Sequence, residues 1–240
     1  MYSKGWSNKI YQAYSELEAD AGTYDNEDWI EKQIKRINNF DDEKELTIFR
    51  NRLLISEVKK FNCKNITIVD FGGGLGLSYL PLKNSGYDNV NYKIIEVPKV
   101  VSMGNLVYKN DKNISFYSDI ENVELFPDIV YIRTSLQYAV DPFSILVKAA
   151  SLKPKKIILC DTACGNIKTF LTYQLWGDQK IPYWFLNRGE IVETLSSSGY
   201  NVNKESVSQS IEHNDSFRDL KSYPDGYRIT TLIDFIFDDE

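Results

Sequence analysis

Polar and apolar positions along residues 1–62 alternate with helical periodicity. The clearest stretch is residues 44–61, where apolar side chains recur at helical spacing. They would share one face of a helix: Leu46, Phe49, Leu53, Leu54, Val58 and Phe61. We therefore expect an N-terminal helical region over residues 1–62.

After this region the rhythm changes to short β-branched runs, separated by segments long enough for helices. The expected strands are residues 66–71, 92–97, 114–117, 128–132 and 156–160. Strands that alternate with helical connections predict a parallel sheet covered on both faces.

The C-terminal segment departs from this alternation. Residues 187–198 are expected to form a helix, because Asn187 can cap its first turn and Glu190 occupies the reciprocal position of a capping box. Gly199 ends the helix, and strands over residues 200–207 and 228–237 follow. We expect these two strands to pair antiparallel at one side of the sheet.

Composition and charge narrow the possible partners of this 240-residue chain. Its 42% hydrophobic and 26% charged residues are typical of a globular protein with a core. The formal net charge of −6 repels phosphates on average, so we expect no nucleic-acid partner. No apolar run approaches the roughly 20 residues of a membrane-spanning helix, and the first residues do not resemble a secretion signal. We expect a cytoplasmic protein without integral membrane contact, and the sequence carries no signal for an oligomeric state.

The most informative segment is the glycine-rich run that follows the first expected strand. Asp70 is followed at alternate positions by Gly72, Gly74 and Gly76. Phe71 and Gly73 lie between them and are also candidate cofactor-binding residues. Glycines allow a tight turn in which a ligand can touch the backbone. The dinucleotide pattern G-x-G-x-x-G is not met, because its third glycine position is Leu77 or Tyr79. The run resembles motif I of the class I methyltransferases.

Two further acids follow expected strands. Glu96 is placed to accept both ribose hydroxyls of a nucleoside, and in methyltransferases an acid at the position of Asp119 lies near the adenine amino group. Ligands of open α/β sheets bind where parallel strands end. The other candidate cofactor-binding residues also follow strands: Val97, Ser118, Ile120, Arg133 and Thr134. These acids suit S-adenosyl-L-methionine, which brings positive charge and no phosphate, and whose product is S-adenosyl-L-homocysteine.

The predicted fold is therefore α/β: a Rossmann-like class I methyltransferase fold with a mostly parallel seven-stranded sheet and an antiparallel last strand. We expect residues 1–62 to form a lid, with Trp6 and Tyr24 over the cofactor, and residues 63–240 to form the Rossmann-like domain.

The chain also resembles a family of methyltransferases encoded with bacterial surface-polysaccharide genes. The resemblance covers most of the chain and rests on Trp6, residues 22–25, 70–76, 134–138, 141–142, 173–174 and 181–187. It implies methylation, at oxygen or nitrogen, of a sugar or of a substituent on one, as in a nucleotide sugar or glycan.

Methyl transfer is an in-line displacement, so the protein has to align acceptor, methyl carbon and sulfur. A hydroxyl acceptor also loses a proton, for which we consider His213 first and Asp161 second. His213 is equally compatible with an exposed loop, and Asp161 with a cap on a following helix. We expect no metal, because the fifth strand ends in one acid and the cysteines form no Cys-x-x-Cys pair.

The candidate acceptor-binding residues combine a cation with amide and aromatic side chains. They are Arg133, Gln137, Tyr138, Tyr173, Gln174, Tyr183 and Trp184. Aromatic faces with polar edges suit sugars, but the same side chains also pack protein cores.

Two alternatives to a methyltransferase remain at this stage. One is an NAD-dependent nucleotide-sugar oxidoreductase, which the imperfect dinucleotide pattern disfavours. The other is a catalytically inactive methyltransferase-fold partner protein, which the presence of Asp70, the glycine run and Glu96 disfavours.

Overall fold

The computed structural model describes residues 4–17, 26–61, 65–87, 89–123, 126–176, 179–209 and 220–239. Seven strands form one sheet in the order β10-β11-β6-β5-β2-β3-β4. β2 pairs parallel with β3 and β5, β3 pairs parallel with β4, and β10 pairs antiparallel with β11. The predicted Rossmann-like methyltransferase fold, with its antiparallel last strand, is confirmed.

The strands of this sheet are β2 (Ile66–Phe71), β3 (Val90–Ile95), β4 (Ile114–Tyr117), β5 (Ile129–Arg133), β6 (Lys156–Thr162), β10 (Tyr200–Val207) and β11 (Ile233–Asp239). The helices are α1 (Glu27–Asn38), α2 (Lys44–Arg50), α3 (Arg52–Lys60), α4 (Tyr79–Asn84), α5 (Pro98–Val107), α6 (Pro142–Ser151) and α7 (Arg188–Ser196). β11 begins five residues later than expected, and its consecutive Phe235, Ile236 and Phe237 are all buried, so the strand is covered on both faces. No helix in the described ranges is long and apolar enough to cross a membrane.

The chain packs as two compact units. The glycine-loop unit comprises the described parts of residues 24–133 and 152–158. The hairpin unit comprises the described parts of residues 1–23, 134–151 and 159–240.

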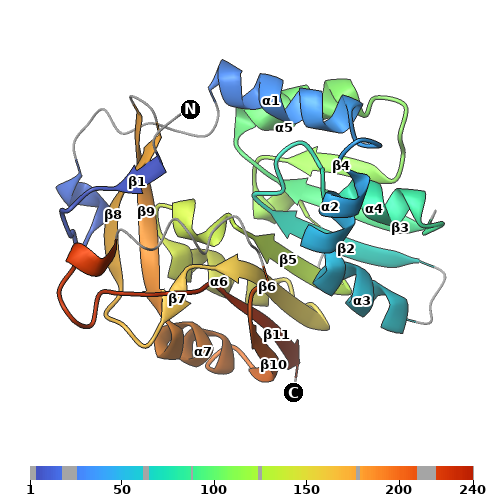
Figure 1. Ribbon diagram of the computed structural model, residues 1–240. Coiled ribbons are helices and arrows are strands. Elements are labelled where there is room, and N and C mark those ends of the chain that lie inside the picture. Colours follow the sequence, from blue (N-terminus) through green and yellow to red (C-terminus); the bar gives the residue numbers. More distant parts are fainter. Residues whose placement is uncertain are drawn as a thin grey trace. The chain divides into compact units, whose positions relative to one another are not determined.

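In the glycine-loop unit, β2 lies between β3 and β5, and its apolar side chains are buried on both faces. This explains why apolar side chains occupy both faces of the strand instead of alternating with polar ones. α1 lies beside α5 (Figure 1), and Ile30 of α1 packs with Leu75 and Val100 in one apolar cluster. α1 therefore packs against the segment that carries the glycines.

The single helix expected over residues 44–61 is two helices, because the backbone breaks at Asn51. The side chain of Asn51 donates to the Thr47 carbonyl oxygen and accepts a hydrogen bond from the Tyr131 hydroxyl of β5. The break also divides the expected apolar face. Leu54 and Val58 of α3 are fully buried, whereas Leu46 and Phe49 of α2 are exposed.

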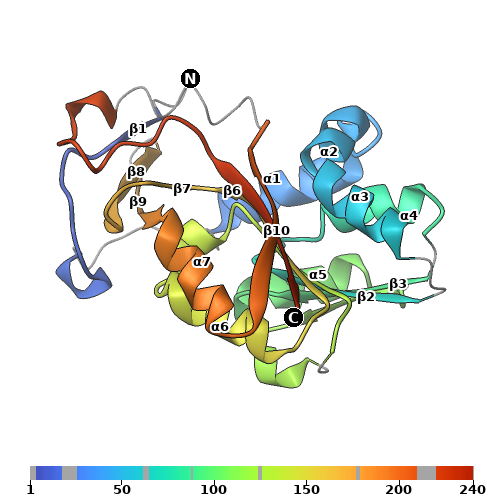
Figure 2. The same cartoon turned by 90° about the horizontal axis from the view of Figure 1, so that it is seen from below.

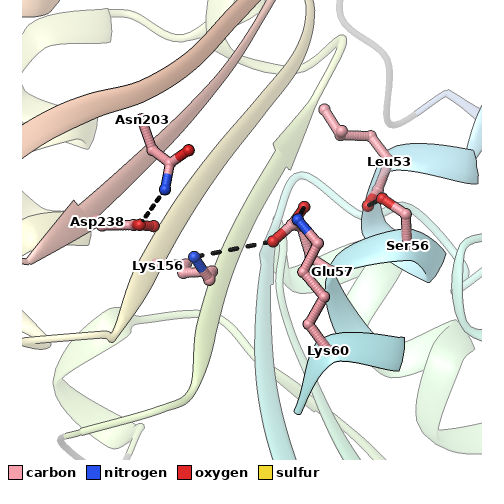
Figure 3. A network of polar contacts seen from close by, with 7 residues as sticks. All are labelled: Leu53, Ser56, Glu57, Lys60, Lys156, Asn203 and Asp238. Atoms are coloured by element: carbon pink, nitrogen blue, oxygen red, sulfur yellow. Dashed lines mark hydrogen bonds and ion pairs between the residues drawn. The ribbon is translucent and has the colours of Figure 1, made fainter.

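α3 carries a buried carboxylate, Glu57, which is neutralised by two lysines (Figure 3). Lys60 donates to it from one turn away at 2.6 Å, and Lys156 at the start of β6 lies 3.8 Å away. A buried charge is tolerated only when it is paired, so these contacts hold α3 to β6 within the glycine-loop unit. In the hairpin unit, Asn203 of β10 donates to Asp238 of β11, a cross-strand bond drawn in the same figure.

The hairpin unit contains a second sheet in the order β1-β8-β9-β7. Its strands are β1 (Lys4–Trp6), β7 (Cys164–Gly165), β8 (Phe170–Trp176) and β9 (Gln179–Asn187). Figure 1 shows β1 alongside the β8–β9 hairpin. β1 corrects the expectation of a wholly helical region over residues 1–62, because Lys4–Trp6 is extended and pairs with β8.

Two expectations on the hairpin unit have opposite outcomes. The cap of α7 is confirmed, since the Asn187 side chain accepts a hydrogen bond from the backbone N–H of Glu190. α7 lies against α6 (Figure 2). The alternative role of Asp161, a cap on a following helix, is wrong, because β6 leads into β7 and then into the β8–β9 hairpin.

Candidate cofactor-binding site

The glycine loop joins the end of β2 to the start of α4. Gly72, Gly74 and Gly76 all have positive φ, which only glycine adopts without strain. The backbone N–H of Gly72 donates to the Ile95 carbonyl oxygen at 2.9 Å, and that of Gly74 donates to Oε1 of Glu96 at 3.0 Å. These two bonds fasten the loop to the end of β3.

Asp70 lies directly behind this loop and is 1% exposed. The Tyr92 hydroxyl of β3 donates to its Oδ2 at 2.6 Å. A side chain at Gly73 would place its Cβ 2.5 Å from the same oxygen, so Gly73 has to be glycine for Asp70 to occupy this position.

Burial raises the pKa of Asp70 to about 7, because a carboxylate loses its hydration there. The hydrogen bond from Tyr92 counteracts this rise, the charge of Glu96 adds to it, and the charge of Arg133 lowers the pKa. Arg133 is the half-buried last residue of β5, and its charge therefore acts on the acid of the glycine loop.

Glu96 follows β3 immediately and is half-buried. While Oε1 accepts from Gly74, its Oε2 accepts from the backbone N–H of Val97 at 2.9 Å. The carboxylate is thus oriented by one backbone N–H of the glycine loop and by the backbone N–H of the next residue in its own chain segment.

Asp119 follows β4 and is exposed, and its side chain accepts a hydrogen bond from the backbone N–H of Glu121 at 3.2 Å. Ile95 pairs in register with both Phe71 and Tyr117, so the ends of β2, β3 and β4 are aligned. The sheet order therefore brings Asp70, Glu96 and Asp119 to one edge, along with the neighbouring Val97, Ser118 and Ile120.

Trp29 of α1 lies beside the glycine loop and was not predicted to do so. Its side chain lies 3.4 Å from the position that a Cβ at Gly74 would occupy, and Gln33 lies 3.7 Å from it. The expected lid residues were Trp6 and Tyr24. Trp6 instead packs edge-on against Tyr183 and Phe185 in the hairpin unit, and Tyr24 lies outside the described residues. Trp29 belongs to the amphipathic helix α1. The amphipathic pattern predicts a helix, but it does not predict which loop the helix packs against.

Of the two candidate bases, His213 lies outside the described residues. Asp161 is 4% exposed and accepts a hydrogen bond from the Ser208 hydroxyl. Its backbone N–H donates to Asp234 of β11 at 2.8 Å, and its carbonyl oxygen accepts from Gln137. Asp161 and Thr134 both have φ near +53°, a conformation that is unusual for residues other than glycine.

The candidate acceptor residues of the hairpin unit divide into two groups. Tyr138 donates to Gln174 at 3.0 Å and packs edge-on against Tyr183, with ring centroids 4.9 Å apart. Tyr173 and Trp184 are next to Gln174 and Tyr183 in sequence, so they point to the other face of the hairpin. The indole N–H of Trp184 donates to the Ala139 carbonyl oxygen. Within the described ranges, no group of three or more His, Cys, Asp or Glu side chains is placed to hold a metal.

No protein-family model matches this sequence, and no curated protein matches it. Several solved structures share its fold. One is a S-adenosylmethionine-dependent methyltransferase from Clostridium acetobutylicum, with a TM-score of 0.55 and 10% identity over 85% of this chain and 98% of that chain. Another is the 1,6-didemethyltoxoflavin-N1-methyltransferase of Burkholderia thailandensis, solved with S-adenosylhomocysteine, with a TM-score of 0.54 and 9% identity over 93% of each chain.

A third is the magnesium protoporphyrin IX methyltransferase from Synechocystis PCC 6803 with bound S-adenosylhomocysteine. It aligns with a TM-score of 0.51 and 13% identity, over 81% of this chain and 83% of that chain. At these identities the comparison shows the fold, and the chemistry has to be argued from this chain's own residues.

Proposed function

We propose that this chain is a methyltransferase that uses S-adenosyl-L-methionine and binds it in the glycine-loop unit. The observation that carries the proposal is the fastening of Gly74 to Glu96, with the buried Asp70 directly behind the loop. Relatives in fold that are named as S-adenosylmethionine-dependent enzymes, or that hold S-adenosylhomocysteine, support it.

The residues present fit this cofactor. The loop backbone carries no side chain at Gly72, Gly73 or Gly74, so a ligand can approach it closely, and the nearby carboxylates suit a cation better than a diphosphate. Glu96 would accept the ribose hydroxyls, Asp119 would lie near the adenine amino group, and Trp29 would cover the loop. The cofactor supplies an electrophilic methyl group on a sulfonium.

The direct test is calorimetric titration of the purified chain with S-adenosylhomocysteine and, separately, with NAD. We expect micromolar or tighter binding of S-adenosylhomocysteine and no heat from NAD. Binding of NAD instead would contradict the proposal and favour the oxidoreductase alternative, and binding of neither ligand would also contradict the proposal.

Glu96→Ala should weaken binding of S-adenosylhomocysteine by roughly 1.5–3 kcal/mol, the range for losing hydrogen bonds to a charged group. The loss has two sources, because Glu96 would bind the ribose and also orients the N–H of Gly74. The matched control is Glu45→Ala, which removes the same charge from an exposed position of α2 in the same unit. Equal affinity of Glu96→Ala and the parent in calorimetry would make Glu96 a surface acid without a role.

For the acceptor we propose a sugar or a sugar-linked substituent in surface-polysaccharide synthesis, presented as a nucleotide sugar or glycan. The sequence resemblance supports this class. Methyl transfer to nucleotide sugars and glycan precursors can be screened by mass spectrometry. A best substrate that is a protein or a nucleic acid would refute this class.

We assign proton removal to His213 first and Asp161 second. His213→Ala and Asp161→Asn in the same assay show which residue is the base. Replacing the base should lower the transfer rate without weakening cofactor binding.

A further inference from the structure

The hairpin unit contains a cavity of about 390 Å³, which lies between the N-terminal segment and the β8–β9 hairpin. This volume is within the range of small-molecule sites. Lys9 and Tyr11 line it from the N-terminal segment, and Tyr173 and Lys180 line it from the hairpin. None of these four residues belongs to the glycine-loop unit.

The wall formed by residues 7–11 is fixed by hydrogen bonds to β8. The backbone N–H groups of Ser7 and Tyr11 donate to the carbonyl oxygens of Tyr173 and Leu171. The fully buried hydroxyl of Thr172 donates to the Lys9 carbonyl oxygen at 2.8 Å. A buried hydroxyl group needs a hydrogen-bond partner, so the bond to Lys9 stabilises the N-terminal segment in its position beside the hairpin.

The lining combines aromatic faces with positive charge. Tyr173 is 2% exposed, and Tyr11 packs edge-on against it with ring centroids 5.7 Å apart. The ammonium group of Lys180 lies 6.0 Å from the centroid of the Tyr173 ring, and the side chains of Lys180 and Lys9 are exposed. Among the described residues that line the cavity, two are lysines and none is acidic, in a chain of net charge −6.

We infer that this cavity binds the negatively charged sugar part of the methyl acceptor, an inference that rests on the proposed function. Lys9 and Lys180 would bind a phosphate or carboxylate through charge-assisted hydrogen bonds, and the half-buried Tyr11 ring would contact the apolar face of the sugar. The exposed side chain of Asn8 adds a donor and an acceptor for hydroxyl groups. The recognised chemistry is an anionic hexose.

The test is calorimetric titration of the full chain, in a phosphate-free buffer of fixed ionic strength, with glucose 1-phosphate, glucuronate, glucose and inorganic phosphate. We expect binding of glucose 1-phosphate or glucuronate, and at least about tenfold weaker binding of glucose and of inorganic phosphate. The better of the two anionic sugars identifies the charged group as phosphate or carboxylate. If glucose bound as tightly as the anionic sugars, charge would have no role in recognition. If inorganic phosphate bound as tightly, the sugar ring would have no role. Either result would overturn the inference, as would no binding of any probe.

Lys9→Gln and Lys180→Gln assign the binding to this cavity. Both lysines are exposed, so the variants should fold, and the double variant should bind the anionic sugar at least about tenfold more weakly. Lys204→Gln, on the exposed surface of β10, is the matched control and should bind like the parent. A double variant with parental affinity would place the ligand elsewhere.

Titration of the same proteins with S-adenosylhomocysteine separates this inference from the proposed function. Cofactor binding without sugar binding refutes the cavity's assignment alone. Sugar binding without cofactor binding refutes the proposed methyltransferase, and with it the assignment of the sugar as an acceptor.

Discussion

Replacing Gly74 by valine is expected to weaken binding of S-adenosylhomocysteine at least about a hundredfold, roughly 2.7 kcal/mol, while the protein still folds. Gly74 has φ +57°, a conformation that a β-branched residue adopts only under strain. Its Cβ would lie 3.4 Å from the Trp29 ring, so the two methyl groups of valine would push away the ring that covers the loop. The Gly74 N–H would also shift away from Glu96. Calorimetry measures the affinity, and circular dichroism checks the fold.

The control for Gly74→Val is Gly86→Val in the same unit. Gly86 has φ +81°, so valine there carries the same kind of backbone strain, but no atom lies within 4 Å of its Cβ. Gly86→Val should lower thermal stability and leave cofactor affinity unchanged. Retained binding by Gly74→Val, or equal loss in both variants, would show that the loop does not contact the ligand.

The glycine loop and its flanking strand could be predicted from sequence because their signals are local. The apolar run over residues 66–71 is long enough to identify a buried strand, and Asp70 followed by alternate glycines identifies the turn. Glu96 could be found in the same way, since it directly follows the next strand. Once the strands are taken as parallel neighbours, their C-terminal ends lie at one edge of the sheet, which brings Asp70 and Glu96 together.

The features that escaped prediction depend on contacts between distant parts of the sequence. The break at Asn51 is held by Tyr131, a partner eighty residues away. Trp29 covers Gly74 through packing that no local pattern encodes. The β8–β9 hairpin is a different case, because its aromatic residues and Thr172 favour strands, and Pro182 disfavours a helix interior. That signal was present in the sequence, although no strand was predicted over residues 170–187.

The cofactor affinity of the parent protein should fall by about tenfold between pH 8 and pH 6, the ratio for a site that must ionise with a pKa of about 7. Asp70 is fully buried beside the glycine loop, and its ionised form favours a ligand that carries positive charge. Protonation of Asp70 below its pKa removes this attraction. Calorimetric titrations with S-adenosyl-L-methionine at several pH values measure the effect.

Asp70→Asn isolates the contribution of this group, because asparagine keeps an oxygen that can accept the Tyr92 hydrogen bond but carries no charge. At pH 8 the variant should bind at least about tenfold more weakly than the parent, and the two affinities should converge at pH 6. Asp42→Asn, at an exposed position of the same unit, should retain the parental profile. A flat parental profile, or an equal slope in Asp70→Asn, would contradict the role of Asp70.

The same group makes the stability of the unliganded protein depend on pH in the opposite direction. Because the pKa of Asp70 is higher in the folded chain than its ordinary value of 3.8, the folded state binds more protons between these values. The stability that Asp70 contributes is fully present below pH 4 and is lost as the pH rises through about 7. From pH 6 to pH 8 the thermal unfolding midpoint of the parent should therefore fall relative to that of Asp70→Asn. Saturating cofactor should abolish this difference, because the tighter binding at pH 8 offsets the stability that the unliganded parent loses. Parallel midpoints for the two proteins would show that Asp70 is already ionised at pH 6.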